Sequence, residues 1–375
     1  MTVPMRVRCA TVTVGTALLA GACSDRPPVR IGVVAIDEGV AGARLAVAEI
    51  NNARGIHGRA LSLRVMPGAG SILARIALVA ADSLSADPTI IGVVGHSNSS
   101  ASLSGSQIYN ARHVVQIAPT SSAPVLSAAG PYTFRLVASD IHQARFLAKE
   151  ITAGGARPPT AVFFVNDEYG RPFFQELRAR LTEARVPLVL ESPYSQDSPL
   201  TEVDVVARAV ADSRAETVVW LGRSAQLRQL LPALRRLAPR IQVLASDGVD
   251  DQATERNADG VLTGVRFACF LDMRGSRPAL VALRDRIRAT TGTTATVETA
   301  LAYDAVMLLA TAAREVGTRR ESIREYLASL GTTRPPFPGA SGDIAFDENG
   351  DPRPSYCLAE VGAQGVRVIR SSAGP

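Results

Sequence analysis

The sequence predicts an α/β protein with two Rossmann-like lobes, each built on a parallel sheet, joined by a hinge of several chain crossings. Apolar runs rich in valine and isoleucine alternate with helical patterns from residue 29 to residue 245, as in parallel sheets covered by helices on both faces. The alternation restarts near residue 141, and a chain of 375 residues is longer than one hydrophobic core usually supports. We therefore expect two lobes.

The first set of elements begins with a continuous apolar strand at residues 29–36. A helix at 40–52 follows, because Val40, Ala43 and Val47 recur at helical spacing. The same two patterns predict the other elements of this set, which are strands at 60–66, 89–94 and 114–118 and helices at 72–83 and 101–112.

A second set of strands and helices follows. Its helices are expected at 141–152, 171–184, 203–212 and 224–237, and its strands at 160–165, 187–191, 217–221 and 241–245. After a segment at 261–267 come helices at 278–289, 297–316 and 321–330, and β segments at 342–346, 355–361 and 366–370. The polar run at 347–351 reads as a turn between strands.

These late elements must complete lobes that began much earlier in the chain. We expect lobe 1 to comprise residues 29–140 and 270–355, and lobe 2 to comprise residues 141–269 and 356–375. Several crossings between two lobes make a hinge, and the cleft between the lobes is the expected ligand site.

Residues 1–22 have the pattern of a signal peptide for export. Arg6 and Arg8 form a short positive region, and the apolar stretch at 10–20 is too short to span a bilayer. Small residues then precede Cys23. This ending fits either a bacterial lipobox, with a lipid on Cys23, or an ordinary signal cleavage site; we expect the lipid anchor and a periplasmic or cell-surface location.

Charge and composition argue against a nucleic-acid partner. The formal net charge of +5 falls to +3 without Arg6 and Arg8. Lys149 is the only lysine among 40 basic residues, and no stretch clusters five of them. The abundance of arginine is therefore read as genomic base composition.

Cysteine usage agrees with export. Without Cys9 in the signal and Cys23 at its end, Cys269 and Cys357 remain. They form either a disulfide in an oxidising compartment or two buried free thiols.

Two loops rich in hydroxyl groups follow neighbouring predicted strands. One is Gly95–Ser100, and the other is Pro119–Ser122. Ligands of open α/β sheets bind outside the carboxyl ends of the strands. The first loop also lies at a helix N-terminus, where free amides and the helix dipole favour a carboxylate. Serine and threonine also cap helices and turns, which is the structural alternative for each hydroxyl.

No pattern of catalytic or metal-binding residues accompanies these loops. The four histidines are scattered, without the HxxxH or HExxH spacing that convergent metal ligands need. There is no G-x-S-x-G elbow, no P-loop and no GxGxxG. We expect no enzyme activity, no metal and no cofactor. A hydrolase that uses a serine of the 97–102 run is a remote alternative, with His96 as the nearest base.

In this organisation the chain resembles the type I periplasmic binding proteins, specifically the leucine/isoleucine/valine receptors of branched-chain amino acid ABC importers. The resemblance covers nearly all of residues 29–370. It rests on the order and spacing of several short motifs: Gly95-His96 with its serine run, Ile117–Pro124, Asp167–Gly170, Ala245–Gly248, Tyr303–Ala305 and Phe346–Asp351.

The resemblance implies a role for individual residues of the pocket. Ser99 would hold the ligand carboxylate, and Thr120 and Ser122 would contact both backbone ends of the ligand. Tyr169 would close over the ligand from lobe 2, and Asp247 would pair with the α-ammonium group. Three neighbours complete the expected ligand-binding set: Ser100, Ser121 and Arg223.

Some of these residues have a structural alternative. Asp247 could instead cap the helix near Asp250, Tyr169 could pack at a helix start, and Arg223 could be solvated. Asp250 and Asp251 are interpreted as a solvated pair.

Departures from the family leave the ligand open. The loop at 37–39 is very short, where the family carries a longer loop with a pocket aromatic. Asn98 stands where a disulfide cysteine is common, and Arg223 stands where a tyrosine is expected. A pocket arginine would favour an acidic group on the ligand.

We therefore expect an exported receptor that captures a small polar ligand in the interlobe cleft. The resemblance implies a branched-chain or other amino acid and delivery to an ABC permease. The alternative is a sensory or amide/urea-type receptor of the same fold that acts on a signalling partner.

Overall fold

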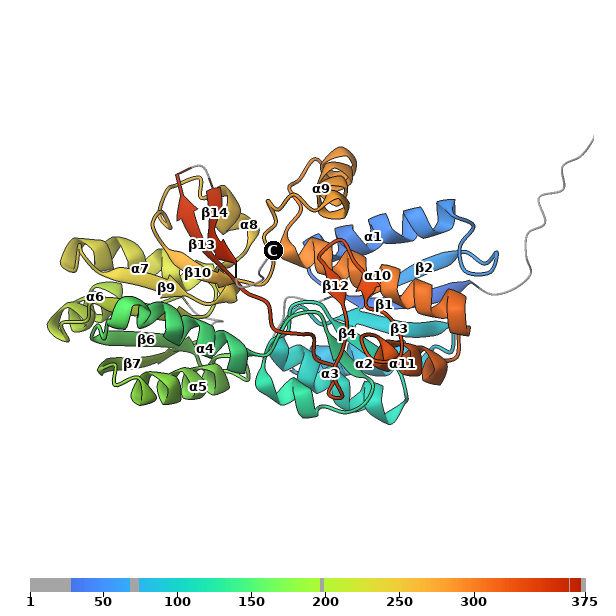
Figure 1. The fold of residues 1–375 in the computed structure, drawn as a ribbon, viewed down its shortest axis with the longest axis horizontal. Coiled ribbons are helices and arrows are strands. Elements are labelled where there is room, and N and C mark those ends of the chain that lie inside the picture. Colours follow the sequence, from blue (N-terminus) through green and yellow to red (C-terminus); the bar gives the residue numbers. More distant parts are fainter. Residues whose placement is uncertain (1–27, 68–73, 196–198, 364, 372–375) are drawn as a thin grey trace, which may run out of the picture.

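The computed structural model describes residues 28–67, 74–195, 199–363 and 365–371. The predicted signal peptide at 1–22 and the predicted lipidation site at Cys23 lie outside the described residues. The described chain forms two α/β lobes side by side (Figure 1). None of its helices is both long and apolar enough to cross a membrane.

A parallel sheet of five described strands forms the centre of lobe 1, in the order β2-β1-β3-β4-β5. Every residue of β3 and β4 is buried, because helices cover both faces of the sheet. The strands are β1 (Val29–Val34), β2 (Leu61–Val65), β3 (Ile90–Gly95), β4 (Val115–Ala118) and β5 (Thr133–Arg135).

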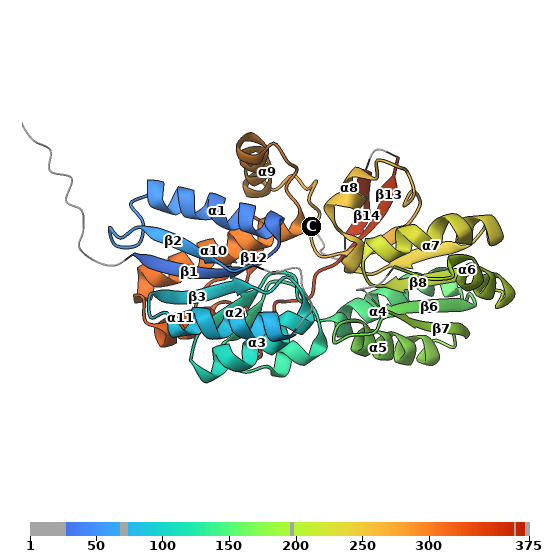
Figure 2. The ribbon, with the colours of Figure 1, turned by 180° about the vertical axis from the view of Figure 1, so that it is seen from behind.

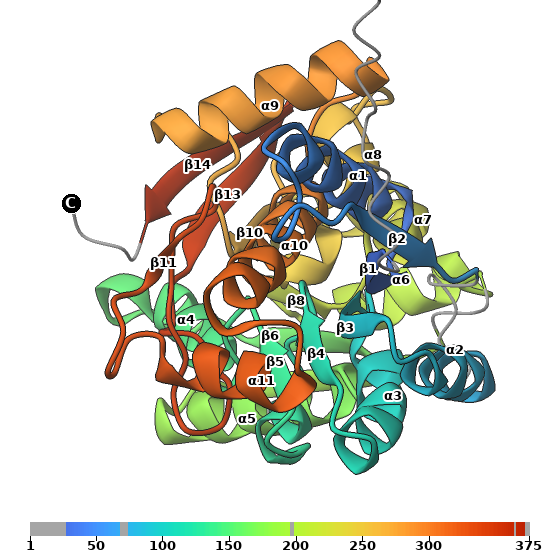
Figure 3. The same cartoon turned by 90° about the vertical axis from the view of Figure 1, so that its right-hand side faces the viewer.

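Helices from both halves of the chain surround this sheet, as the end-on view in Figure 3 shows. They are α1 (Asp37–Asn52), α2 (Ala74–Ala86), α3 (Ser99–Ala111), α9 (Pro278–Thr291), α10 (Val297–Val316) and α11 (Arg320–Ser329). The C-terminal α10 packs along the N-terminal α1. Gly42 permits this approach, since a Cβ there would lie 2.1 Å from the carbonyl oxygen of Thr299.

Lobe 2 is built on a sheet of seven described strands in the order β14-β13-β10-β9-β8-β6-β7. The strands from β6 to β10 pair in parallel, whereas β13 and β14 are antiparallel additions at one edge. The strands are β6 (Thr160–Val165), β7 (Leu188–Tyr194), β8 (Thr217–Leu221), β9 (Gln242–Ala245), β10 (Arg266–Cys269), β13 (Cys357–Gly362) and β14 (Gly365–Ser371).

Apolar clusters on both faces of this sheet make the core of lobe 2. The helices of this lobe are α4 (Asp140–Ile151), α5 (Gly170–Glu183), α6 (Val203–Asp212), α7 (Ser224–Leu237) and α8 (Gln252–Arg256), as the rear view in Figure 2 also shows. Short elements complete the chain: the 3-10 turns η1 (Pro124–Ala128), η2 (Ala153–Gly155) and η3 (Asp247–Val249), and the paired strands β11 (Phe337–Pro338) and β12 (Asp343–Ile344).

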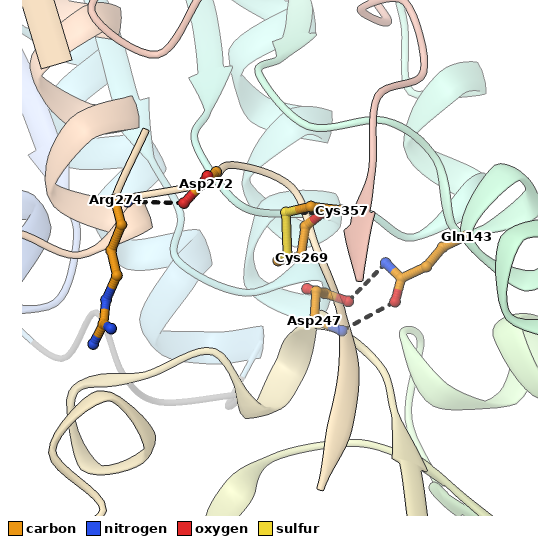
Figure 4. Close-up of a disulfide and its surroundings, with 6 residues drawn as sticks. All are labelled: Gln143, Asp247, Cys269, Asp272, Arg274 and Cys357. Carbon is orange, nitrogen blue, oxygen red and sulfur yellow. Dashed lines mark hydrogen bonds between the residues drawn. A yellow bond between two sulfur atoms is a disulfide. The ribbon is translucent and has the colours of Figure 1, made fainter. Parts of the chain in front are cut away.

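Within the described residues, three segments run between the lobes. They are residues 136–139 after β5, 270–277 after β10, and 345–356 before β13. Two of them leave lobe 2 at a disulfide between Cys269 and Cys357, whose Cα atoms are 4.9 Å apart (Figure 4). The disulfide therefore lies where two of the crossing segments meet lobe 2.

Three local expectations were wrong. The short strand β5 was not predicted, and the residues 37–39, interpreted as a loop, form the first turn of α1. Asp37 and Glu38 in that turn suit the positive end of the helix dipole. The strand at 187–191 continues to Tyr194 as β7.

Candidate ligand-binding site

A cavity of about 120 Å³ lies between the lobes, at the carboxyl ends of strands from both sheets. Loops after β3 and β4 and the first turn of α10 line it from lobe 1, and loops after β6, β8 and β9 line it from lobe 2. This edge is where open α/β sheets bind ligands. Pockets for drug-sized ligands are roughly 300–1,000 Å³, so this cavity suits a smaller solute.

The loop after β3 brings Ser97 and Ser99 to the cavity wall. Asn98 caps α3, because its side-chain oxygen accepts a hydrogen bond from the amide of Ala101 at 2.9 Å. The helix therefore begins at the cavity. The Ser99 hydroxyl accepts a hydrogen bond from the amide of Ala123 at 3.2 Å, which links the two hydroxyl-rich loops.

A buried carboxylate, Glu298, faces these loops from the first turn of α10. The hydroxyl of Ser97 donates to its Oε1 and the hydroxyl of Thr120 donates to its Oε2, both at 2.6 Å. Burial raises the pKa of Glu298, although the two hydroxyl donors and the charge of Arg223 act to lower it.

Asp247 and Tyr169 form the facing wall in lobe 2. The Tyr169 hydroxyl donates to Asp247 Oδ1 at 2.9 Å. Gln143 holds the same residue twice: its amide nitrogen donates to Asp247 Oδ1 at 2.9 Å, and its oxygen accepts from the Asp247 amide at 3.0 Å (Figure 4). Asp247 thus has a fixed orientation towards the cavity.

A second buried carboxyl lies behind this wall. Ser122 lines the cavity and donates to Asp140 at 3.0 Å. Burial, followed by the nearby charge of Asp247, raises the pKa of Asp140 well above its usual range. Burial also raises the pKa of Asp247, against the lowering by Gln143, Tyr169 and Arg223. Ionisation of Asp247 therefore disfavours ionisation of Asp140.

Arg223 is the cation among the residues that line the cavity, and Asp250 and Asp251 line it as well. Burial raises the pKa of Asp250 well above its usual range. Asp251 caps the next turn, since it accepts a hydrogen bond from the amide of Thr254 at 2.8 Å. The expectation that Asp250 and Asp251 form a merely solvated pair was wrong, because η3 turns both towards the cleft.

The lobes also contact one another beside the cavity. The Ser100 hydroxyl, on α3 of lobe 1, donates to Glu168 Oε2, before α5 of lobe 2, at 2.6 Å. Among the described residues, no three His, Cys, Asp or Glu side chains come together as a metal site.

The family profile of periplasmic binding proteins matches residues 32–365. The chain belongs to this family. The match spans both lobes, and its description implies an extracytoplasmic protein whose family members bind solutes rather than transform them.

Curated relatives of this periplasmic binding protein agree with that assignment. It is 24% identical over 331 residues to the Leu/Ile/Val-binding protein homolog 1 of Brucella abortus (strain 2308), covering 86% of each chain. It is 23% identical over 314 residues to the leucine-, isoleucine-, valine-, threonine-, and alanine-binding protein of Pseudomonas aeruginosa, covering 83% of this chain and 81% of that one.

Solved structures share the fold across different ligands. A leucine-binding protein of Thermotoga maritima has a TM-score of 0.81 at 20% identity, covering 92% of this chain and 98% of its own. A solute-binding protein of R. palustris in complex with benzoate has a TM-score of 0.79 at 14% identity, covering 92% and 97%. The fold of this periplasmic binding protein therefore does not by itself select a ligand.

The structure brings most of the predicted ligand residues to one cavity. Those that line it are Ser99, Thr120, Ser122, Tyr169, Arg223 and Asp247. Two do not. The hydroxyl of Ser100 is used in the contact with Glu168, and Ser121 lies buried behind the loop, 2.8 Å from the Ser102 hydroxyl.

Sequence reasoning missed Glu298 and Gln143. A glutamate in the first turn of a helix is ordinarily explained by its favourable interaction with the helix dipole. A glutamine on an amphipathic helix is ordinarily assigned to the face exposed to solvent. One signal was available in the sequence. Glu298 stands beside Val297 at the start of a long, largely apolar helix, and burying a carboxylate there costs free energy unless it has hydrogen-bond partners.

Proposed function

We propose that this protein is a receptor for a small polar solute, an amino acid or a close analogue, which it captures between its lobes and delivers to an ABC permease. The observation that carries this proposal is the opposition of Asp247 on lobe 2 to the hydroxyl-rich loops of lobe 1 across one small cavity. A carboxylate on one wall binds an ammonium group, and hydroxyls and amides on the other bind polar groups of the ligand.

Closure of the lobes is the mechanism. A ligand that touches both walls has more contacts in the closed form, and it shifts the population towards that form by the difference in its affinity for the two forms. The segments at 136–139, 270–277 and 345–356 would act as the hinge, with lobe boundaries near residues 140, 270 and 356. No chemical step is required of the protein.

The receptor would act at the membrane surface. Export by the signal at 1–22 and a lipid on Cys23 would hold it beside its permease. Its known relatives, which are named as binding proteins for leucine, isoleucine and valine, support an amino acid ligand or analogue of one.

A thermal-stability panel tests this function. The chain from Ser24 onward keeps every described residue, and it is melted with amino acids, their amides, simple amines and small carboxylates. A ligand that binds only the folded state at 100 times its Kd stabilises it by about 2.7 kcal/mol. We expect a raised melting temperature with at least one amino compound, and loss of that shift in Asp247→Ala.

Two results would contradict the proposal. One is the absence of a shift with every amino compound, which would favour a sensory receptor whose partner is a protein. The other is a shift that Asp247→Ala leaves unchanged.

A further inference from the structure

Glu298 occupies two of the hydroxyl groups on the lobe 1 wall of the cavity. Its two oxygens accept the hydrogen bonds of Ser97 and Thr120, each at 2.6 Å. The Ser122 hydroxyl also donates to a protein carboxyl, that of Asp140, whereas the Ser99 hydroxyl accepts from the Ala123 amide. The lobe 1 wall of the cavity therefore already contains a carboxylate, supplied by the protein.

The backbone around Glu298 holds this carboxylate in place. Thr296 and Thr299 form a capping box that fixes the first turn of α10. Gly39 on α1 leaves the space that the carboxylate fills, since a Cβ there would lie 3.0 Å from Glu298 Oε1. Only 8% of Glu298 is exposed in this arrangement of the lobes.

The ionisable groups that line the cavity are mostly carboxyl groups. Arg223 is the one cation among the described residues that line it. The carboxylates that line it come from both lobes and are Glu38, Asp167, Asp247, Asp250, Asp251 and Glu298. A carboxylate on the ligand would meet like charge on each wall.

We propose that the cleft selects a carboxylate-free organic cation, such as an amino acid amide or a simple amine, and that Glu298 sets this preference. This inference rests on the proposed receptor function, and it names the ligand class. The ammonium group would lie between Glu298 and Asp247, whose carboxylates face the cavity from opposite lobes. The aromatic residues Tyr169 and Phe270 line the same cavity.

A multi-atom cation fits this arrangement better than a metal ion. A metal ion needs several ligands within one coordination sphere. Among the described residues no three carboxylates converge in that way, whereas carboxylates on separate walls can contact different parts of an extended amine.

Matched pairs of ligands test the proposal by titration calorimetry. Leucine and leucinamide, lysine and lysinamide, and phenylalanine and phenylalaninamide differ only in the replacement of a carboxylate by an amide. We expect the wild-type chain from Ser24 onward to bind an amide at least about tenfold more tightly than its acid, because like charges repel in the cleft. In Glu298→Gln, which keeps the shape but removes the charge, this preference should shrink about tenfold.

Glu315→Gln is the matched control. It makes the same change near the other end of α10, where Glu315 pairs with Arg334 at the surface. It should leave the ratio of amide to acid affinity unchanged.

The outcomes separate this inference from the function on which it rests. An acid that binds the wild type as tightly as its amide would overturn the inference while supporting an amino acid receptor, whether or not Glu298→Gln folds. A melting shift with calcium or magnesium chloride, and none with any amine, would overturn it in favour of a metal ion. Absence of binding by acids and amides alike would overturn the receptor function itself.

Discussion

We expect Asp247 to couple ligand binding to a proton. Its pKa is raised by burial, and the groups that face it are Asp140, Gln143, Tyr169 and Arg223. A cation beside the carboxylate favours the ionised form and lowers the pKa, so binding releases a proton from any molecule in which Asp247 is protonated. Affinity should therefore be highest above the pKa of free Asp247 and should fall below it.

The first prediction concerns the pH dependence of affinity. Titrations between pH 7 and about pH 4, the ordinary carboxyl range, should show a Kd that rises by up to about tenfold for each pH unit below the pKa of Asp247. Asp247→Asn should bind weakly with a shallower slope, to which Glu298, whose pKa is also raised, still contributes. Asp140→Asn should keep the slope and its midpoint, because the pKa of Asp140 is raised further than that of Asp247 and Asp140 is therefore already neutral where Asp247 titrates. A flat profile in the wild type would contradict the role of Asp247.

Sequence patterns could indicate part of the site at this scale. Thr120 and Asp247 stand in loops directly after apolar strands, and the carboxyl ends of parallel strands meet at one edge. Glu298 could not be found in this way, because its partners Ser97 and Thr120 are 201 and 178 residues away. Tertiary packing decides which carboxylate accepts the hydrogen bonds of these hydroxyl groups.

Among the elements, α3 contributes twice to the interlobe region. Its first turn lines the cavity through Ser99, and its second residue, Ser100, donates to Glu168 across the lobes. A hydrogen bond to a charged group contributes about 1.5–3 kcal/mol at most, and less where the carboxylate is partly solvated. This contact exists only while the lobes are together.

The second prediction is that Ser100→Ala favours the open form without touching the ligand. We expect a larger radius of gyration by small-angle X-ray scattering in the free protein and a Kd raised about three- to tenfold, in line with a loss of about 1 kcal/mol. Ser104→Ala is the control, since that hydroxyl bonds only to the Ser100 carbonyl oxygen of its own helix, at 2.8 Å. Equal scattering curves for the two variants would show that the contact does not bias closure.

Most elements were predictable because their patterns are local. Continuous apolar runs gave β1, β3 and β6, and helical spacing gave α1 and α10. The strand β5 has three residues, too few for a period to show, and it exists because it pairs with β4. This strand can be recognised only from its pairing within the sheet, not from its own three residues.

For the whole molecule, the disulfide closes a covalent loop that leaves lobe 2, passes through lobe 1 and returns to lobe 2. Cys269 and Cys357 are separated by 88 residues, and the intervening chain builds α9, α10 and α11 of lobe 1 before it returns. A cross-link over a loop of this length restricts the unfolded chain and stabilises the folded state by about 2–4 kcal/mol.

The third prediction follows from that cross-link. The double variant Cys269→Ala with Cys357→Ala should unfold at lower denaturant, with a free energy of unfolding lower by about 2–4 kcal/mol, while retaining its ligand affinity. Reductant should destabilise the wild type by a similar amount and leave the variant unchanged. Equal stability of oxidised wild type and double variant would show that the disulfide adds nothing.

The arrangement of the two lobes lies furthest from what local patterns can predict. The number of βα units indicated two lobes, but membership of β13 and β14 in the lobe 2 sheet depends on pairing with β10, which precedes β13 by 88 residues. Likewise, the antiparallel direction of β13 relative to β10 follows from its return across the hinge. Such long-range pairing is decided by burial in the assembled sheet.

A crystal structure of the chain from Ser24 onward, grown with the amino compound that raises its melting temperature most, tests the central claim directly. We expect the compound in the interlobe cavity, with its ammonium group within hydrogen-bond distance of Asp247 and its other end against the loop that carries Thr120. A larger depression of about 970 Å³ lies along α1 and the end of β2. The compound in that depression, with the interlobe cavity empty, would contradict the account.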